Sequence, residues 1–184
     1  MASSSFQIKE LELPGVLLIQ PRRFEDVRGF FMETFHQEAL ASAGINVTFV
    51  QDNLSYSKKN VLRGLHFQKS PHAQAKLVRC VFGEISDVVA DHNSDSPSFG
   101  RHVVVTLSGD TQAMLYIPAI YAHGFCVLSD EASVEYKVDK YYHAESAHGV
   151  RYDDPVFGIT WPVHEPILSE QDMKWPLLAS VQKR

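Results

Sequence analysis

The sequence predicts a mainly β protein, an antiparallel jelly roll or small β-barrel with a few peripheral helices, formed as a single domain over residues 1–184. Short runs rich in β-branched and aromatic residues follow one another, separated by turn residues. Helical periodicity is confined to two segments, and no repeat, low-complexity linker or Pro/Gly-rich hinge divides the chain. At 184 residues and 45% hydrophobic, the chain is long enough for one sizeable core.

The expected strands follow the chain in order, each bounded by turn-forming residues such as Gly, Pro, Asn or Asp. They are residues 15–21, 46–53, 60–68, 75–83, 84–91, 100–109, 112–118, 123–130 and 132–142. One helix is expected over residues 33–44, where Gly44 ends it, and a second begins near Ser169 within residues 168–184. These elements share one core because nothing separates them into two units.

The charge balance limits the possible partners. The chain has 17 basic and 22 acidic residues, a net charge of −5, which argues against broad binding to nucleic acid or an anionic membrane. No stretch approaches a membrane span, and the N-terminal residues lack a basic region followed by an apolar run. Cys80 and Cys126 lie in apolar segments and fit buried side chains in a reducing compartment. We expect a soluble, cytoplasmic protein in which local cations hold any anionic ligand.

The run VLRGLHFQ places an arginine, a glycine and a histidine inside a strand. Strict alternation sends Arg63 and His66 to opposite faces. Gly64 lies between them and can mark a bulge that redirects one side chain. Either the two side chains converge on one site, or one of them faces a partner subunit.

Two further strands send polar groups toward apolar faces. Alternation aligns Tyr136 with Val134 and Val138, and Lys76 with Val78. From the pattern alone, a core tyrosine bonded to a carbonyl and a lysine that reaches back to solvent remain alternatives to a functional role.

The pattern allows two interpretations for each of His123 and Asp172. His123 shares a face with Phe125 and is either a satisfied core histidine or a ligand-contacting one. Ser169 and Asp172 have the spacing of a helix start, so Asp172 is either a capping residue or a catalytic one.

Nine histidines raise the question of a metal. A mononuclear site in a small β-barrel needs imidazoles and a carboxylate that converge, often from an H-x-H pair, and no H-x-H occurs here. Walker-type and G-x-G-x-x-G loops are absent as well. The sequence therefore predicts neither a metal nor a cofactor.

Taken together, these segments resemble the dTDP-4-dehydrorhamnose 3,5-epimerase family, metal-free cupins of the dTDP-L-rhamnose pathway. The resemblance runs from about residue 8 to residue 175. The motifs that carry it occur in order: DVRGFFMETF, FVQDNLSYS, VLRGLHFQ, PHAQAKLVR, GEISDVVAD, YIPAIYAHGF, VEYKVDKYY and LSEQD.

The resemblance implies a reaction and a catalytic set. The substrate is a dTDP-linked 4-keto-6-deoxy sugar, whose C3 and C5 hydrogens are acidic because both carbons flank the C4 ketone. His66 matches the base, Asp172 its carboxylate partner, and Tyr136 the acid that returns a proton to the opposite face. Lys76 matches the lysine that stabilises the enolate.

The resemblance also implies binding residues and an oligomeric state. The arginines match the diphosphate-binding positions, the amides and the acid match nucleotide contacts, His123 contacts the sugar, and Tyr142 stacks on thymine. These positions are Arg28, Glu33, Gln51, Asn53, Arg63, His123 and Tyr142. Family members are homodimers in which an N-terminal strand crosses to the partner, so Arg28 and Glu33 are expected to serve the neighbouring site.

Three positions depart from the family pattern. Gln171 stands where a lysine is usual, Ala147 where an acidic residue is common, and Phe67 where a tyrosine is frequent. The departures bear on nucleotide affinity more than on reaction type. The leading reading is the double epimerase. An epimerase acting at C3 or C5 alone on a related dTDP-4-keto sugar, and a non-catalytic cupin that binds sugar nucleotides, are the alternatives.

Overall fold

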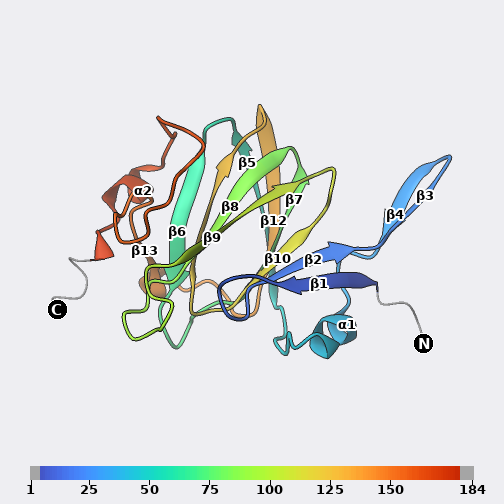
Figure 1. Cartoon of the computed structure of the whole chain (residues 1–184), viewed down its shortest axis with the longest axis horizontal. Helices are drawn as coiled ribbons and strands as arrows, with labels where there is room; N and C mark the ends of the chain where they lie inside the picture. Colours follow the sequence, from blue (N-terminus) through green and yellow to red (C-terminus); the bar gives the residue numbers. More distant parts are fainter. Residues whose placement is uncertain (1–4, 179–184) are drawn as a thin grey trace.

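The structure is a computed structural model that describes residues 5–178. Two antiparallel sheets face each other and enclose the core, so the predicted fold class is confirmed (Figure 1). In sheet order, the six-stranded sheet contains β1 (Phe6–Glu10), β2 (Leu17–Pro21), β10 (Met114–Ile117), β7 (Lys76–Phe82), β12 (Glu131–Val138) and β5 (Gln51–Lys58). The five-stranded sheet contains β13 (Ala147–Gly149), β6 (Leu62–Gln68), β11 (Ala122–Val127), β8 (Glu84–Ala90) and β9 (His102–Ser108).

The remaining elements lie outside the two sheets. Strands β3 (Arg23–Asp26) and β4 (Gly29–Met32) form a hairpin that projects away from the body of the molecule (Figure 1). The helices are α1 (Gln37–Ser42) and α2 (Glu170–Lys174), and a 3-10 helix, η1, spans Ala144–Ser146.

The main core lies between the sheets and draws side chains from both. Val78 and Leu115 come from the six-stranded sheet, and Ile85 and Phe125 from the five-stranded one. Each is at most 5% exposed, and burying such a side chain stabilises the fold by about 1.5–3 kcal/mol. The core therefore holds the two sheets together and fixes the space that remains between them.

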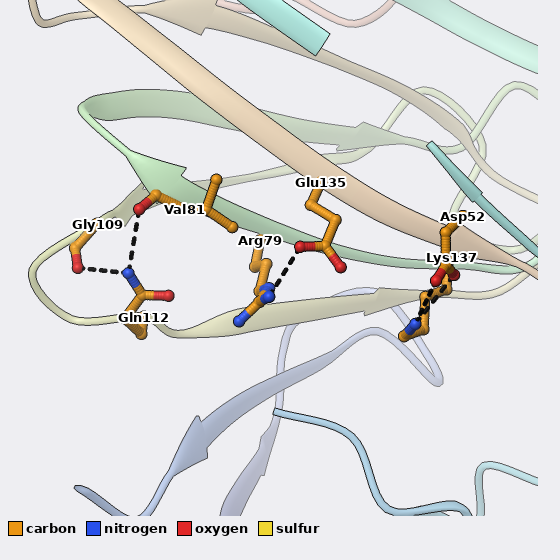
Figure 2. A network of polar contacts seen from close by, with 7 residues as sticks. All are labelled: Asp52, Arg79, Val81, Gly109, Gln112, Glu135 and Lys137. Carbon is orange, nitrogen blue, oxygen red and sulfur yellow. Dashed lines mark hydrogen bonds and ion pairs between the residues drawn. The ribbon is translucent and has the colours of Figure 1, made fainter. Parts of the chain in front are cut away.

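The outer face of the six-stranded sheet carries two cross-strand ion pairs (Figure 2). Arg79 Nη2 lies 2.7 Å from Glu135 Oε2, and Lys137 Nζ lies 2.9 Å from Asp52 Oδ2; each pair joins residues directly opposite in the ladder. Cross-strand pairs of opposite charge contribute about 0.2–1 kcal/mol each. With Arg79 pointing outward, Lys76 on the same strand points to the inside.

Strand β5 begins at Gln51, although the sequence predicted a strand over residues 46–53. In this strand the apolar side chains face solvent and the polar ones face inward. Leu54 and Tyr56 are 69% and 53% exposed, whereas the less exposed positions are polar, with Ser57 buried and Ser55 lining a cavity. The prediction was wrong because the inner face of this strand lines a polar site instead of the core.

The sequence missed four strands, β1, β3, β4 and β13. These strands have three to five residues, and every residue of β3 is exposed. Strand β1 does alternate, with Phe6 and Ile8 less exposed than Gln7 and Lys9, but over only five residues. Such short strands give a weak period-two signal.

Both helices are shorter than predicted. Helix α1 ends at Ser42, and Gly44, with a φ of +91°, follows at the expected stop. Helix α2 begins after Ser169 as predicted, and it ends before Trp175 because Pro176 disfavours a helical conformation at the preceding residue. Residues 179–184 of the predicted helix lie outside the described residues.

Candidate active site

A cavity of about 390 Å³ is lined by side chains of both sheets and of the α2 segment. Seven of the residues singled out in the sequence line it, and so do the three positions that depart from the family pattern. These are Arg63, His66, Lys76, His123, Tyr136, Tyr142 and Asp172, with Phe67, Ala147 and Gln171. Residues more than 100 positions apart thus meet at one place, as His66 and Asp172 show.

A bulge in β6 brings Arg63 and His66 to the same cavity. In the ladder with β11, His66 pairs with His123 and Arg63 pairs with Phe125, so β6 has one more residue than its partner in this interval. Gly64 sits in the bulge with a φ of +133°, a conformation that side chains rarely adopt. The predicted bulge is confirmed, and it makes the two side chains converge.

His66 Nε2 forms a hydrogen bond with Asp172 Oδ1 across the wall of the cavity. Asp172 is 3% exposed, and burial alone would raise its pKa, but hydrogen bonds from His66, Ser169 and Trp175 lower it below the ordinary value. The carboxylate is therefore ionised at neutral pH and can only accept, so Nε2 carries the proton. In the neutral imidazole, this hydrogen bond leaves the lone pair on Nδ1.

Asp172 also takes part in the start of α2. Its backbone N–H donates to Ser169 Oγ at 3.1 Å, and the Ser169 hydroxyl donates to Asp172 Oδ2 at 2.8 Å. The two readings from the sequence are thus compatible. The helix start places the carboxylate, and the carboxylate meets His66.

Lys76 is 9% exposed and lies at the inner face of β7. Burial lowers the pKa of its ammonium to about 8, and the charge of Asp87 opposes this shift. Lys76 Nζ donates to the His66 carbonyl oxygen at 3.3 Å. This lysine does not reach back to solvent, which leaves a desolvated cation inside the cavity.

Asp87 on β8 is fully buried, and the sequence analysis did not single it out. Its two carboxylate oxygens lie 3.0 and 2.9 Å from His123 Nε2. Burial lowers the pKa of His123, although Asp87 opposes the shift. The signal in the sequence was one acidic residue inside the apolar run of that strand, which favours a buried partner of the opposite charge.

Tyr136 points into the cavity from β12, as alternation predicted. Burial raises the pKa of its phenol, with Arg63 opposing the shift, so the hydroxyl keeps its proton at neutral pH. Arg63 is held by Ser57, whose Oγ accepts from Nε at 3.0 Å, and by the Tyr56 carbonyl at 3.4 Å. These two hydrogen bonds hold the guanidinium as a fixed cation beside the cavity.

The other four predicted residues do not line the cavity. Gln51 is joined to it indirectly, because its Oε1 accepts from the Tyr142 backbone N–H at 3.2 Å and its Nε2 donates to Asn53 Oδ1 at 2.8 Å. Arg28 pairs with Asp26 at the turn of the projecting hairpin, and Glu33 follows β4. Arg28 and Glu33 lie away from the cavity of their own chain.

Phe125 and Ser169 also line the cavity, although the sequence indicated only structural roles for them, and five further lining residues were not named from the sequence at all. These five are Ser55, Gln68, Gln74, His148 and Trp175. They are uncharged or weakly basic side chains in strands and loops, and nothing in the local pattern marks them. Among residues 5–178, no group of three or more His, Cys, Asp or Glu side chains is arranged to hold a metal ion. In the same range no helix is long and apolar enough to cross a membrane.

The family model described as dTDP-4-dehydrorhamnose 3,5-epimerase matches residues 10–180. The chain belongs to this family. A relative from Shigella flexneri named dTDP-4-dehydrorhamnose 3,5-epimerase is 50% identical over 163 residues, which cover 88% of this chain and 90% of the relative.

Solved structures of the epimerase family have the same fold. One is an epimerase from Legionella pneumophila in complex with dTDP-4-keto-L-rhamnose, 43% identical with a TM-score of 0.91, covering 95% of this chain and 93% of that one. Another is a 3′-monoepimerase from Streptomyces bikiniensis in complex with dTDP, 32% identical with a TM-score of 0.89, covering 95% and 88%. That protein carries a double substitution, of a histidine to asparagine and a tyrosine to phenylalanine.

Proposed function

We propose that this chain is a dTDP-4-dehydrorhamnose 3,5-epimerase. It converts dTDP-4-dehydro-6-deoxy-D-glucose to dTDP-4-dehydro-L-rhamnose by inverting C3 and C5, in dTDP-L-rhamnose biosynthesis. The observation that carries the proposal is the cavity of a chain of this family in which His66, paired with Asp172 of α2, and a protonated Tyr136 lie on different sheets. Names of relatives that match nearly the whole chain support the same activity.

His66 starts the reaction by taking a proton from carbon. Its Nδ1 lone pair accepts the C–H proton, and the electrons of that bond move into the enolate of the C4 ketone. The imidazole becomes a cation, which Asp172 stabilises through the Nε2–H hydrogen bond. Asp172 is nearly inaccessible to water, which strengthens this interaction.

Lys76 and Tyr136 complete the exchange. The buried ammonium of Lys76 favours negative charge that develops on the ketone oxygen. Tyr136 then delivers its proton to the opposite face of the carbon, which inverts the centre. No electrons leave the sugar, so the reaction needs no redox cofactor.

The nucleotide is held at the mouth of the cavity. Arg63 binds the diphosphate, a task for which the planar guanidinium is suited. Tyr142, which is 62% exposed, stacks on thymine, and Gln51 and Asn53 lie beside it as amide contacts. The complex of the Legionella protein supports a dTDP-sugar as the ligand.

A second candidate is inversion at only one centre. The Streptomyces bikiniensis relative is described as a 3′-monoepimerase, and its fold covers almost the whole of this chain. The histidine and tyrosine substituted in that protein are separated by as many residues as His66 and Tyr136. The same pair of groups is thus compatible with either outcome.

The projecting hairpin supports a homodimer with exchange of this N-terminal segment. Phe24, Phe30 and Phe31 of β3 and β4 are 49%, 48% and 71% exposed, and neighbouring exposed aromatic side chains of this kind are typical of a surface that contacts another protein. In the dimer, Arg28 and Glu33 reach the partner's cavity and add to its nucleotide site. A cytoplasmic location remains a prediction from the sequence.

Incubation with dTDP-4-dehydro-6-deoxy-D-glucose in deuterated water tests the proposal. We expect deuterium at both C3 and C5 of the product, located by NMR. Incorporation at one carbon assigns the chain to the single-centre epimerases. Incorporation at neither carbon, with the ligand bound, identifies a binding protein and contradicts the proposed activity.

A further inference from the structure

Trp175 follows α2 and contacts both members of the His66–Asp172 pair. Its indole Nε1–H donates to Asp172 Oδ1 at 3.3 Å, and its ring meets the His66 ring edge to face, with centroids 6.3 Å apart and an interplanar angle of 67°. The side chain also lines the cavity. It is the third group, after Ser169 and His66, that binds the same carboxylate.

The three donors divide the two oxygens of Asp172 between them. Oδ2 accepts from the Ser169 hydroxyl, and Oδ1 accepts from both His66 Nε2 and Trp175 Nε1. With donors on both oxygens, rotation of the carboxylate about its bond breaks at least one of these hydrogen bonds. Because the indole shares Oδ1 with the imidazole, it also withdraws part of the negative charge that His66 experiences.

Gly149 makes the room that the indole occupies. A Cβ atom at this position would lie 2.5 Å from Trp175 Cε2 and 2.6 Å from Nε1. The φ of Gly149 is not positive, so its backbone does not require glycine. Gly149 is also the direct cross-strand partner of His66. Gly149 therefore lacks a side chain because the Trp175 indole, which packs beside His66, occupies that space.

We propose that Trp175 is a positioning residue. Its indole N–H orients the Asp172 carboxylate, which in turn orients His66, and Gly149 leaves the space in which this indole packs. The inference rests on the proposed function, because it concerns the base of that reaction. The neighbouring backbone supports it, since Arg151 N–H donates to the Pro176 carbonyl at 3.2 Å and ties the residue after Trp175 to the segment after β13.

Replacing Trp175 by phenylalanine keeps an aromatic ring and removes only the donor. We expect kcat to fall about tenfold, the effect of roughly 1.4 kcal/mol in the barrier, while KM changes less. The acid limb of the kcat/KM profile should move to higher pH, because a carboxylate with one donor fewer holds the imidazolium more strongly. Loss of packing alone would lower activity without moving that limb.

Trp161→Phe is the matched control. Trp161 is the only other tryptophan, and its Nε1 donates to the Tyr152 carbonyl at 2.8 Å, outside the cavity. This variant should keep the kcat and the pH profile of the unmodified protein. It also leaves Trp175 as the single tryptophan, so binding of dTDP-sugar should change the tryptophan fluorescence, a readout that does not depend on turnover.

A double-mutant cycle tests whether Gly149 leaves the space for the Trp175 indole. Gly149→Ala should lower kcat in the presence of Trp175, and it should cost nothing further in a Trp175→Ala background, where the space is free. Circular dichroism melting verifies that each variant is folded. Equal effects of Gly149→Ala in both backgrounds would overturn the role of Gly149. An unchanged kcat and acid limb in Trp175→Phe would overturn the role of Trp175. In both cases an active unmodified protein leaves the proposed function standing, whereas an unmodified protein without exchange contradicts the function itself.

Discussion

His66 and Tyr136 face one cavity from opposite sheets of the jelly roll. His66 stands on β6 of the five-stranded sheet, and Tyr136 stands on β12 of the six-stranded sheet. In the proposed reaction, a sugar ring bound between them would present one face to the imidazole and the other to the phenol. Placing the proposed base and the proposed acid on opposite sides is the arrangement that an inversion requires.

Tyr136→Phe should separate the two proton transfers. The ring packing remains, the base still forms the enolate, and the imidazole returns a solvent-exchanged proton to the face it came from. We expect deuterium to enter the sugar while inversion falls by about 10²–10⁴, the contribution of a positioned acid. His66→Asn should abolish exchange and inversion together. If Tyr136→Phe loses exchange as completely as His66→Asn, the tyrosine is needed for enolate formation and the assignment is wrong.

Lys76 should set the basic limb of the pH profile. Its pKa is lowered to about 8, so the ammonium loses its proton as the pH rises through that value, and kcat/KM of the free enzyme should fall there. The pKa of Tyr136 is raised, so the phenol still holds its proton in this range. Lys76→Arg keeps the charge to far higher pH and should remove the limb, even if overall activity drops. A limb near pH 8 that persists in this variant belongs to another group.

Tyr142→Ala should weaken nucleotide binding. Loss of one stack between a base and an aromatic ring costs about 1–3 kcal/mol, which corresponds to a rise in KM of roughly ten- to a hundredfold. Steady-state kinetics should show kcat less affected, and Tyr142→Phe, which keeps the ring, should behave nearly like the unmodified protein. A large fall in kcat at saturating substrate would place Tyr142 in the chemistry.

Arg28 should act in the partner's cavity, which a mixing experiment can reveal. Arg28→Ala and His66→Asn each damage every site of their own homodimers. A mixed dimer contains one cavity with His66 intact that receives Arg28 from the partner. Co-expression should therefore restore activity to about a quarter of the unmodified level, since half of randomly paired dimers carry one intact site. No restoration means that Arg28 serves its own chain, or that no dimer forms.

Much of the fold could be predicted because most strands alternate as the core demands. Tyr136 and Lys76 were placed correctly on inner faces by counting in twos from Val134 and Val78. The start of β5 was missed because that strand turns polar residues inward. Periodicity reports burial in an apolar core, and it fails where the inside of the molecule is a binding site.

The candidate site was harder to predict than the fold. The resemblance to the family supplied Asp172 and Tyr142, which no local pattern distinguishes from a helix cap and an exposed aromatic. Asp87 and Trp175 were missed because their significance comes from contacts with residues distant in the sequence. Such contacts follow from how the sheets and α2 come together, and a one-dimensional pattern carries no information on them.

The bulge of β6 has a consequence for redesign of this enzyme. Gly64 and Gly124 approach each other closely at the bulge, where the ladder register shifts. A Cβ on Gly64 would lie 2.5 Å from Gly124 Cα, and one on Gly124 would lie 2.7 Å from the Arg63 carbonyl oxygen. Neither position accepts a side chain without a backbone shift, so β6 and β11 form a fixed frame that carries Arg63 and His66 together, the residues proposed as diphosphate anchor and base. Libraries aimed at other nucleotide sugars should leave this frame untouched and diversify the positions around Ala147 and Gln171, which line the cavity outside the frame.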